Sequence, residues 1–150
     1  MVGAAALPGI ERVAIRTPEN DTLEPGLDFV VADALRRELL RRGGAALVES
    51  PEQADLVISG RVAALRAAAR SHSSVFFAIE YGVTLELDLV TASSDGARLE
   101  AVHRRIQADE RYLSSADVEA ERKNRDEAVR RVAAVLASRY FDRISEALQP

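Results

Sequence analysis

Cysteine is missing from this sequence of 150 residues, and histidine is scarce. The lack of cysteine excludes thiolate zinc sites, iron–sulfur clusters, disulfide bonds and cysteine nucleophiles. The two histidines, His72 and His103, are too few to form a histidine-rich metal site by themselves. No apolar run approaches the roughly 18 residues of a membrane-spanning helix. The sequence therefore predicts neither a metal site nor a bound cofactor.

Positive charge is also in deficit, since 24 acidic residues stand against 20 basic ones and the formal net charge is −4. This balance disfavours a nucleic-acid partner, because neutralising phosphates requires a surplus of clustered cations. Apolar residues make up 47% of the chain and charged residues 29%, which is ordinary for a globular protein. The length predicts one domain over residues 1–150, with residues 1–8 as a flexible lead-in without the basic region of a signal peptide.

The first third of the chain predicts a strand followed by a helix. Residues 11–16 alternate polar and apolar side chains, as a short half-buried strand does. From Leu27 to Arg42, apolar residues recur at spacings of three and four, and Gly43 then ends the predicted helix. Arginines crowd the final turns, where cations favour the negative end of the helix dipole, so we expect them on a solvated face. They are Arg36, Arg37, Arg41 and Arg42.

The middle of the chain carries strand patterns. Residues 45–49 and 55–62 predict two strands, and the small and polar residues at 67–75 predict an interruption. Six apolar residues in strict alternation between 79 and 89 predict a long strand with one dry face and one wet face. The wet face would hold the acidic residues Glu80, Glu86 and Asp88.

Residues 93–96, which end in the pair Asp95-Gly96, predict a hairpin turn. A partner strand follows at 97–109, and its apolar phase switches as at a bulge. Residues 121–148 predict the longest helix. The fold class is therefore α+β, with two helices packed on one face of a mixed or antiparallel sheet of about four strands, in the order β-α-β-β-β-α. One core accounts for the apolar stripes, so we expect a monomer.

The catalytic inventory is small. A Ser-His-Asp triad is formally possible with His72 or His103, but the chain has no Gly-x-Ser-x-Gly elbow. It also has no phosphate-binding loop and no dinucleotide-binding fingerprint. We therefore expect no enzyme and no catalytic residue, and a small hydrolase is the least favoured alternative.

Two aromatic residues stand together before the long alternating strand, and neighbours in a strand cannot both face the same side. An exposed aromatic there suits docking to a protein or lipid surface, whereas a strand end tucked beneath a helix is the structural alternative. Arg66 and Arg70 flank the predicted loop before this pair, and Arg104 and Arg105 lie on the predicted partner strand. Guanidinium groups beside apolar side chains suit phosphorylated amphiphiles. The candidate contact residues are Arg66, Arg70, Phe76, Phe77, Arg104 and Arg105.

Five segments share their order and spacing with a known family. They are LPGIERVAI at 7–15, ENDTLEPGL at 19–27, LRREL at 35–39, ADLVISGRV at 54–62 and NRDEA at 124–128. Over roughly residues 7–148, the sequence resembles the LptE family of outer-membrane lipoproteins. The resemblance implies a sandwich of two helices on a sheet, which agrees with the fold expected from periodicity.

The resemblance also implies partners and a location. LptE proteins sit inside the LptD β-barrel as a plug and assist delivery of lipopolysaccharide to the outer leaflet, on the periplasmic side of the cell outer membrane. The implied partners are thus an LptD-like barrel, lipopolysaccharide and the outer membrane. Family members carry a signal peptide and a lipidated cysteine, and this sequence has neither. We interpret it as a chain that begins after that cysteine, with Met1 added.

Another small periplasmic lipoprotein of similar build is the alternative, such as a regulator of cell-wall synthases or a secretion-pore component. The order of strands and helices alone does not separate these functions. The matching segments are structural and assign no lipid-binding residue, so the six candidate contact residues rest on their position.

Overall fold

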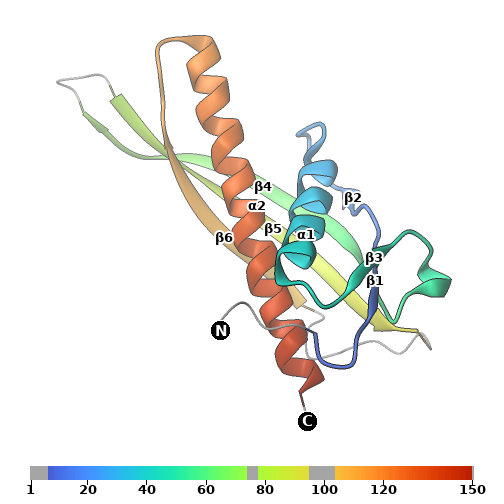
Figure 1. The fold of residues 1–150 in the computed structure, drawn as a ribbon. Helices are drawn as coiled ribbons and strands as arrows, with labels where there is room; N and C mark the ends of the chain where they lie inside the picture. The colour runs from blue at the N-terminus through green and yellow to red at the C-terminus, as the bar shows by residue number, and fades with distance from the viewer. Residues whose placement is uncertain (1–6, 74–77, 95–103, 150) are drawn as a thin grey trace.

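The computed structural model describes residues 7–73, 78–94 and 104–149, and for residues 70–73, 78, 79 and 104 it describes the backbone alone. Two helices, α1 (Leu27–Arg42) and α2 (Val118–Leu148), pack on one face of a six-stranded mixed sheet (Figure 1). A short 3-10 helix, η1 (Pro51–Gln53), precedes the fourth strand. The strands are β1 (Arg12–Ile15), β2 (Glu19–Asn20), β3 (Ala46–Val48), β4 (Leu56–Ser73), β5 (Ala78–Ser93) and β6 (Arg104–Leu113).

The sheet runs in the order β3-β1-β4-β5-β6, and β2 also pairs with β4. β1 is parallel to both β3 and β4, whereas β4, β5 and β6 form an antiparallel unit. Parallel β1 and β3 require a crossover, and α1 supplies it. The predicted α+β class is confirmed, although the sheet has more strands than the four expected.

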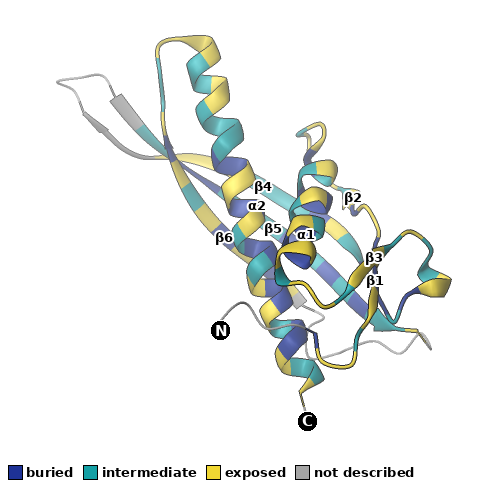
Figure 2. Ribbon diagram, in the orientation of Figure 1, coloured by how far each residue is buried: buried dark blue, intermediate teal, exposed yellow. Residues whose placement is uncertain are grey.

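The core lies between the helices and the sheet (Figure 2). On α1, the apolar stripe at spacings of three and four is almost completely buried, from Leu27 through Val31 to Leu39. On β5, Leu85, Leu87 and Leu89 are at most 1% exposed and face the helices. α1 and β5 therefore each bury one stripe of apolar side chains, as the two periodicities in the sequence predicted.

β4 is much longer than predicted. The expected interruption at 67–75 is wrong as far as residue 73, because the chain stays paired with β5 through Ala67, Ala68 and Ala69. Two register shifts, after Val62 and after Ala69, move side chains to the opposite face and so break the alternation on which the prediction depended. The small side chains of Ala67, Ala68 and Ala69 give no alternating pattern that would indicate a strand, although the three residues pair with β5.

The last strand and helix differ from the prediction in their bounds. β6 begins at Arg104, and the expected turn and bulge between residues 95 and 103 lie outside the described residues. α2 begins three residues before the predicted start, because Asp117 caps it and accepts a hydrogen bond from the backbone N–H of Glu119 at 3.0 Å. β4 and β5 extend past the helices (Figure 1).

Candidate functional site

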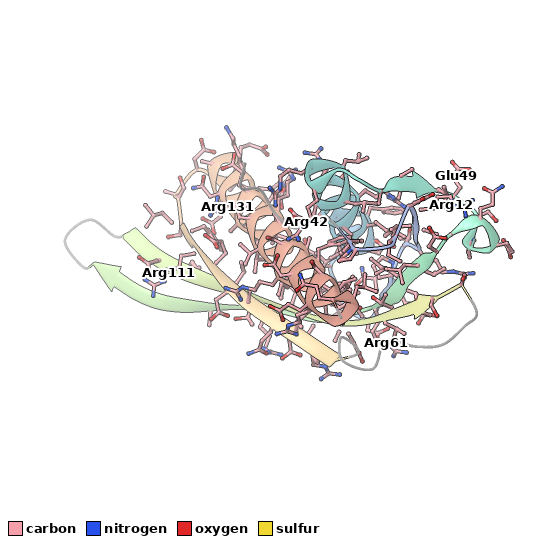
Figure 3. The ribbon with its side chains drawn as sticks, turned by 60° about the horizontal axis from the view of Figure 1, so that its bottom comes forward. Arg12, Arg42, Glu49, Arg61, Arg111 and Arg131 are labelled. Atoms are coloured by element: carbon pink, nitrogen blue, oxygen red, sulfur yellow. The ribbon has the colours of Figure 1, made fainter. Side chains whose placement is uncertain are left out.

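The open face of the sheet, which is the face opposite the helices, holds the candidate contact residues that the structure describes. β5 directs its leucines to the core and its acidic residues, Glu80, Glu86 and Asp88, to this side. β6 adds Arg105 and Arg111. Figure 3 shows Arg61 and Arg111 on the strands, whereas Arg42 and Arg131 belong to the helical layer. The wet face predicted for residues 79–89 is confirmed.

Arg66, Glu86 and Arg105 form a cluster across three neighbouring strands, called the Glu86 cluster below. The Nη2 of Arg66 donates to Oε1 of Glu86 at 2.6 Å, and the Nη1 of Arg105 lies 3.9 Å from its Oε2. The carboxylate is 14% exposed, whereas the two arginine side chains are 57% and 60% exposed. One shielded acid thus holds two solvent-facing cations, which leaves one excess positive charge toward solvent.

The structure brings together two of the six candidate contact residues, Arg66 and Arg105. The backbones of Arg70 and Arg104 lie on β4 and β6, but their side chains are not described. Phe76 and Phe77 lie outside the described residues.

Other polar groups of the open face are paired across strands as well. Thr84 donates to Asp109 at 2.5 Å, and the Nη1 of Arg111 donates to Oε1 of Glu80 at 3.0 Å. Each pair joins β5 to β6 on the solvent side. The face therefore presents both signs of charge in alternation, which suits a polar partner better than a large anion of one sign.

A hollow of about 440 Å³ opens beside this face, with Gly60, Arg61 and Asp88 in its wall. Gly60 has φ of +146°, and a Cβ there would lie 2.2 Å from the backbone oxygen of Asp88. Only glycine allows β4 and β5 to approach this closely. The glycine of the segment ADLVISGRV is therefore required by the sheet.

The aspartate of that same segment fixes the start of β1. Asp55 Oδ2 accepts hydrogen bonds from the backbone N–H groups of Glu11 and Arg12 at 2.9 and 3.0 Å. These two bonds lower the pKa of the Asp55 carboxyl. Asp55 acts as a structural acceptor where the neighbouring strands β1 and β4 begin.

Two other segments that carry the family resemblance bind each other. Asn20 Oδ1 accepts from the backbone N–H and the hydroxyl of Thr22, and its Nδ2 donates to the carbonyl of Glu24. The Glu24 carboxylate then accepts two hydrogen bonds from Arg125 of α2, at 2.9 and 3.0 Å. The segments ENDTLEPGL and NRDEA thus tie the loop before α1 to α2.

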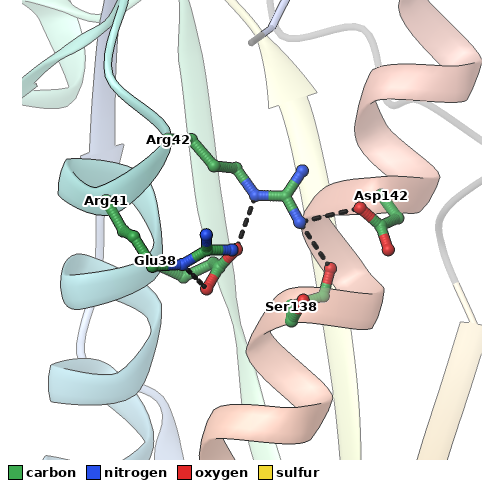
Figure 4. A network of polar contacts seen from close by, with 5 residues as sticks. All are labelled: Glu38, Arg41, Arg42, Ser138 and Asp142. Atoms are coloured by element: carbon green, nitrogen blue, oxygen red, sulfur yellow. Dashed lines mark hydrogen bonds and ion pairs between the residues drawn. The ribbon is translucent and has the colours of Figure 1, made fainter. Parts of the chain in front are cut away.

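A buried network at the end of α1 was missed by the sequence analysis (Figure 4). The Arg42 side chain is only 2% exposed, so the prediction that it lies on a solvated face is wrong. Its Nε donates to Oε2 of Glu38 at 2.6 Å, and its Nη2 donates to the Ser138 carbonyl and to Asp142 at 2.9 and 2.7 Å. With Arg41, these residues form the Glu38 network. The spacing of Glu38 and Arg42 indicates a pair, but gives no sign of its burial.

The electrostatics of the network favour a charged Glu38. Burial alone would raise the pKa of Glu38, but hydrogen bonds from Arg41 and Arg42 outweigh it and lower the pKa below its ordinary value. The Arg42 guanidinium also lies 5.8 Å from the centre of the Phe141 ring, in a cation–π contact. Arg42 and Glu38, the buried charged groups of the network, therefore each have a partner of opposite charge among the described residues. Because Arg42 also binds Asp142, the network connects α1 to α2.

The two histidines considered for a catalytic triad give no geometry, because the His72 side chain and His103 lie outside the part of the chain that the structure describes. Within the described ranges, no three Asp, Glu or His side chains gather in a way that would hold a metal ion. Neither helix, over its described length, is both long and apolar enough to cross a membrane.

Comparison with known proteins gives one family and several structures. The profile of the family described as "LptE: Lipopolysaccharide-assembly" matches residues 10–144. The chain is similar to lipoprotein B from Nitrosomonas europaea, with 15% identity, a TM-score of 0.63 and 95% and 86% of the two chains covered. It is also similar to rare lipoprotein B from Shewanella oneidensis, with 13% identity, a TM-score of 0.57 and 91% and 95% of the two chains covered.

A third similar structure is a PelC dodecamer from Paraburkholderia phytofirmans, with 19% identity, a TM-score of 0.51 and 96% and 95% of the two chains covered. At these identities the structures show a shared fold. Among curated protein sequences, none matches the chain significantly.

Proposed function

The chain belongs to the LptE lipopolysaccharide-assembly family, and from this premise we propose that it plugs and supports an LptD-like β-barrel and assists delivery of lipopolysaccharide to the outer leaflet. The proposed protein is a non-enzymatic lipoprotein, held on the periplasmic side of the cell outer membrane by an N-terminal lipid. The observation that carries the proposal is the family match over residues 10–144. The likeness to two lipoproteins B supports the fold on which it depends.

The open face of the sheet supports a place inside a barrel. The lumen of an outer-membrane barrel is polar, so a plug needs a surface of paired and exchangeable charges rather than a large apolar one. The Glu86 cluster and the Arg111–Glu80 pair are of this kind, since their arginines are more than half exposed and already bound on one side. We place the partner contacts on the part of the open face that holds the Glu86 cluster and the Arg111–Glu80 pair. The proposed contact residues are Arg66, Arg70, Phe76, Phe77, Arg104 and Arg105.

The test is co-expression of the full-length gene with its own LptD-like barrel, followed by affinity purification through a tag on the barrel. We expect a stable one-to-one complex. The double variant Arg66→Glu/Arg105→Glu should weaken the complex, because two solvent-facing cations become anions on the proposed contact surface. The matched control is Arg122→Glu/Arg139→Glu, which makes the same charge change on exposed positions of α2.

Recovery of the barrel alone, while the lipoprotein is secreted normally, would overturn the proposal. Purification through a tag on the lipoprotein itself that recovers a cell-wall synthase or a secretion pore instead of the barrel would establish the alternative function. If the contact variant and the control variant reduced the recovered complex equally, the contact surface would not lie on the open face.

A further inference from the structure

A groove of about 510 Å³ lies between α1 and α2, in the helical layer that covers the face of the sheet opposite the Glu86 cluster. The two helices run in the same direction (Figure 1), since Glu24 binds Arg125 near their first turns and Arg42 binds Asp142 farther along both. Between these two connections, the groove has small apolar side chains from both helices. They are Val30, Ala34 and Ala134.

Four arginines line the groove, two from each helix. They are Arg37, Arg41, Arg130 and Arg131. Among the described residues that line the groove, two are acidic, Asp33 and Glu38, so cations are in excess. The chain as a whole carries a net charge of −4, and yet its two helices contain eleven basic residues against nine acidic ones. The groove is therefore a positive region on an acidic protein, which attracts an anion.

The two arginines of α1 are held in place by acids on their own helix. The Nε of Arg37 lies 2.8 Å from Asp33, and Arg41 donates to both oxygens of Glu38 at 3.1 and 2.5 Å. Their side chains are nevertheless 81% and 57% exposed. Each guanidinium has five N–H donors, and these contacts use one or two of them. Both arginines therefore keep donors for a ligand while losing little freedom on binding it.

The two arginines of α2 complement them. Arg131 is held by Glu110 of β6 at 3.3 Å and by the carbonyl of Arg111 at 2.8 Å. Arg130 is exposed and makes no hydrogen bond or ion pair with another described residue. It lines the groove from α2, while Arg37 and Arg41 line it from α1.

We propose that this groove binds the phosphate groups of a phosphorylated glycolipid headgroup. A guanidinium binds phosphate through two parallel N–H donors, and arginines on both walls match a headgroup with a phosphate at each end. The volume is that of a small-molecule site and has room for sugars but not for several acyl chains. The small apolar residues allow a sugar ring to approach the helices. The identification of the glycolipid with lipopolysaccharide rests on the proposed function.

The test measures binding of three probes to the purified chain in detergent: lipid A with both phosphates, the same lipid with its phosphates removed, and inorganic phosphate. We expect lipid A to bind, and the dephosphorylated lipid to bind about tenfold more weakly or less. The double variant Arg37→Gln/Arg130→Gln should lose about tenfold in affinity for lipid A, because two phosphate contacts are removed. Both positions are exposed, so an unchanged melting temperature shows that the variant is folded.

The control is Arg12→Gln/Arg139→Gln, which removes the same charge outside the groove. Arg12 pairs with Asp55 at the surface as Arg37 pairs with Asp33, and Arg139 is exposed as Arg130 is. The control should bind lipid A as the unmodified chain does. Equal binding of the two lipids, or equal losses in the two double variants, would overturn the proposal. Inorganic phosphate that competes as strongly as lipid A would assign the groove to free phosphate and also overturn it.

The inference can fail while the proposed function holds. Co-purification of the unmodified chain with its barrel, together with phosphate-independent lipid binding, would reject the groove and leave the plug in place. Failure of the barrel complex, with phosphate-dependent binding retained, would reject the plug and leave the groove as a site for phosphorylated glycolipids.

Discussion

The Glu38 network and the Glu86 cluster are built from the same groups at the same distance. In each, two arginines bind one glutamate, and one nitrogen of Arg42 or of Arg66 lies 2.6 Å from the carboxylate. Arg42 is 2% exposed in the first, whereas Arg66 is 57% exposed in the second. Water competes for the second pair but not for the first, so only the first is expected to matter greatly for stability. Burial, rather than distance, separates a structural ion pair from a surface that is available to a partner.

The largest expected effect is that of Arg42→Ala. The change leaves Glu38 and Asp142 without their buried partner, and we expect a loss of about 3–5 kcal/mol in the free energy of unfolding. Urea unfolding followed by circular dichroism measures it. Arg41→Ala, which removes the exposed arginine on the same glutamate, is the control and should cost much less, because an exposed ion pair contributes little to stability. Similar losses for both would show that burial does not set the difference.

Glu38→Gln is expected next, with a loss of about 2–3 kcal/mol at neutral pH, because charge-assisted hydrogen bonds become neutral ones. The pKa of Glu38 is lowered in the folded protein, so its stabilising contribution is present above the ordinary pKa of glutamate and is lost as the pH falls through the lowered value. The difference between the unmodified chain and the variant should therefore shrink below about pH 4. A difference in unfolding free energy that stays constant from pH 7 to pH 3 would contradict this.

An intermediate case sharpens the comparison. Arg125 and Glu24 are 29% and 33% exposed, between the two extremes, and are joined by two hydrogen bonds. We expect Arg125→Gln to cost about 1 kcal/mol, measured by the same unfolding experiment. The nearby Arg122→Gln, whose side chain is 67% exposed, should have no measurable effect. If Arg125→Gln lowered the free energy of unfolding as much as Arg42→Ala, burial of an ion pair would not determine its contribution to stability.

The smallest effect on stability is expected for the Glu86 cluster. Arg66→Gln should change the free energy of unfolding by at most about 0.5 kcal/mol, and added salt should reduce even this change. Unfolding at low and at high ionic strength measures both. A loss above about 2 kcal/mol would mean that this cluster supports the fold, and its proposed use as a contact surface would lose its basis.

Part of the candidate site could be predicted from the sequence. The alternation between residues 79 and 89 predicted the wet face on which Glu86 lies, and the arginine at position 66 was named as a candidate. That Arg66 and Arg105 share one carboxylate could not be predicted, because it depends on two register shifts in β4 and on the pairing of β6. The groove between the helices was not predicted either, since nothing in the sequence places Arg37 beside Arg130.

The sequence by itself determined the elements whose signal is local. Apolar residues that recur every three to four positions, with Gly43 at the end, defined α1 and its buried face. Apolar residues at every second position defined β5 and its two faces. Tertiary structure alone decided which polar groups are buried. Arg42 and Arg41 are neighbours with the same chemistry, yet Arg42 contacts Asp142, a hundred residues away, and Arg41 faces solvent. Burial is a property of what packs against a residue, and the pattern of side chains around it in sequence does not contain that information.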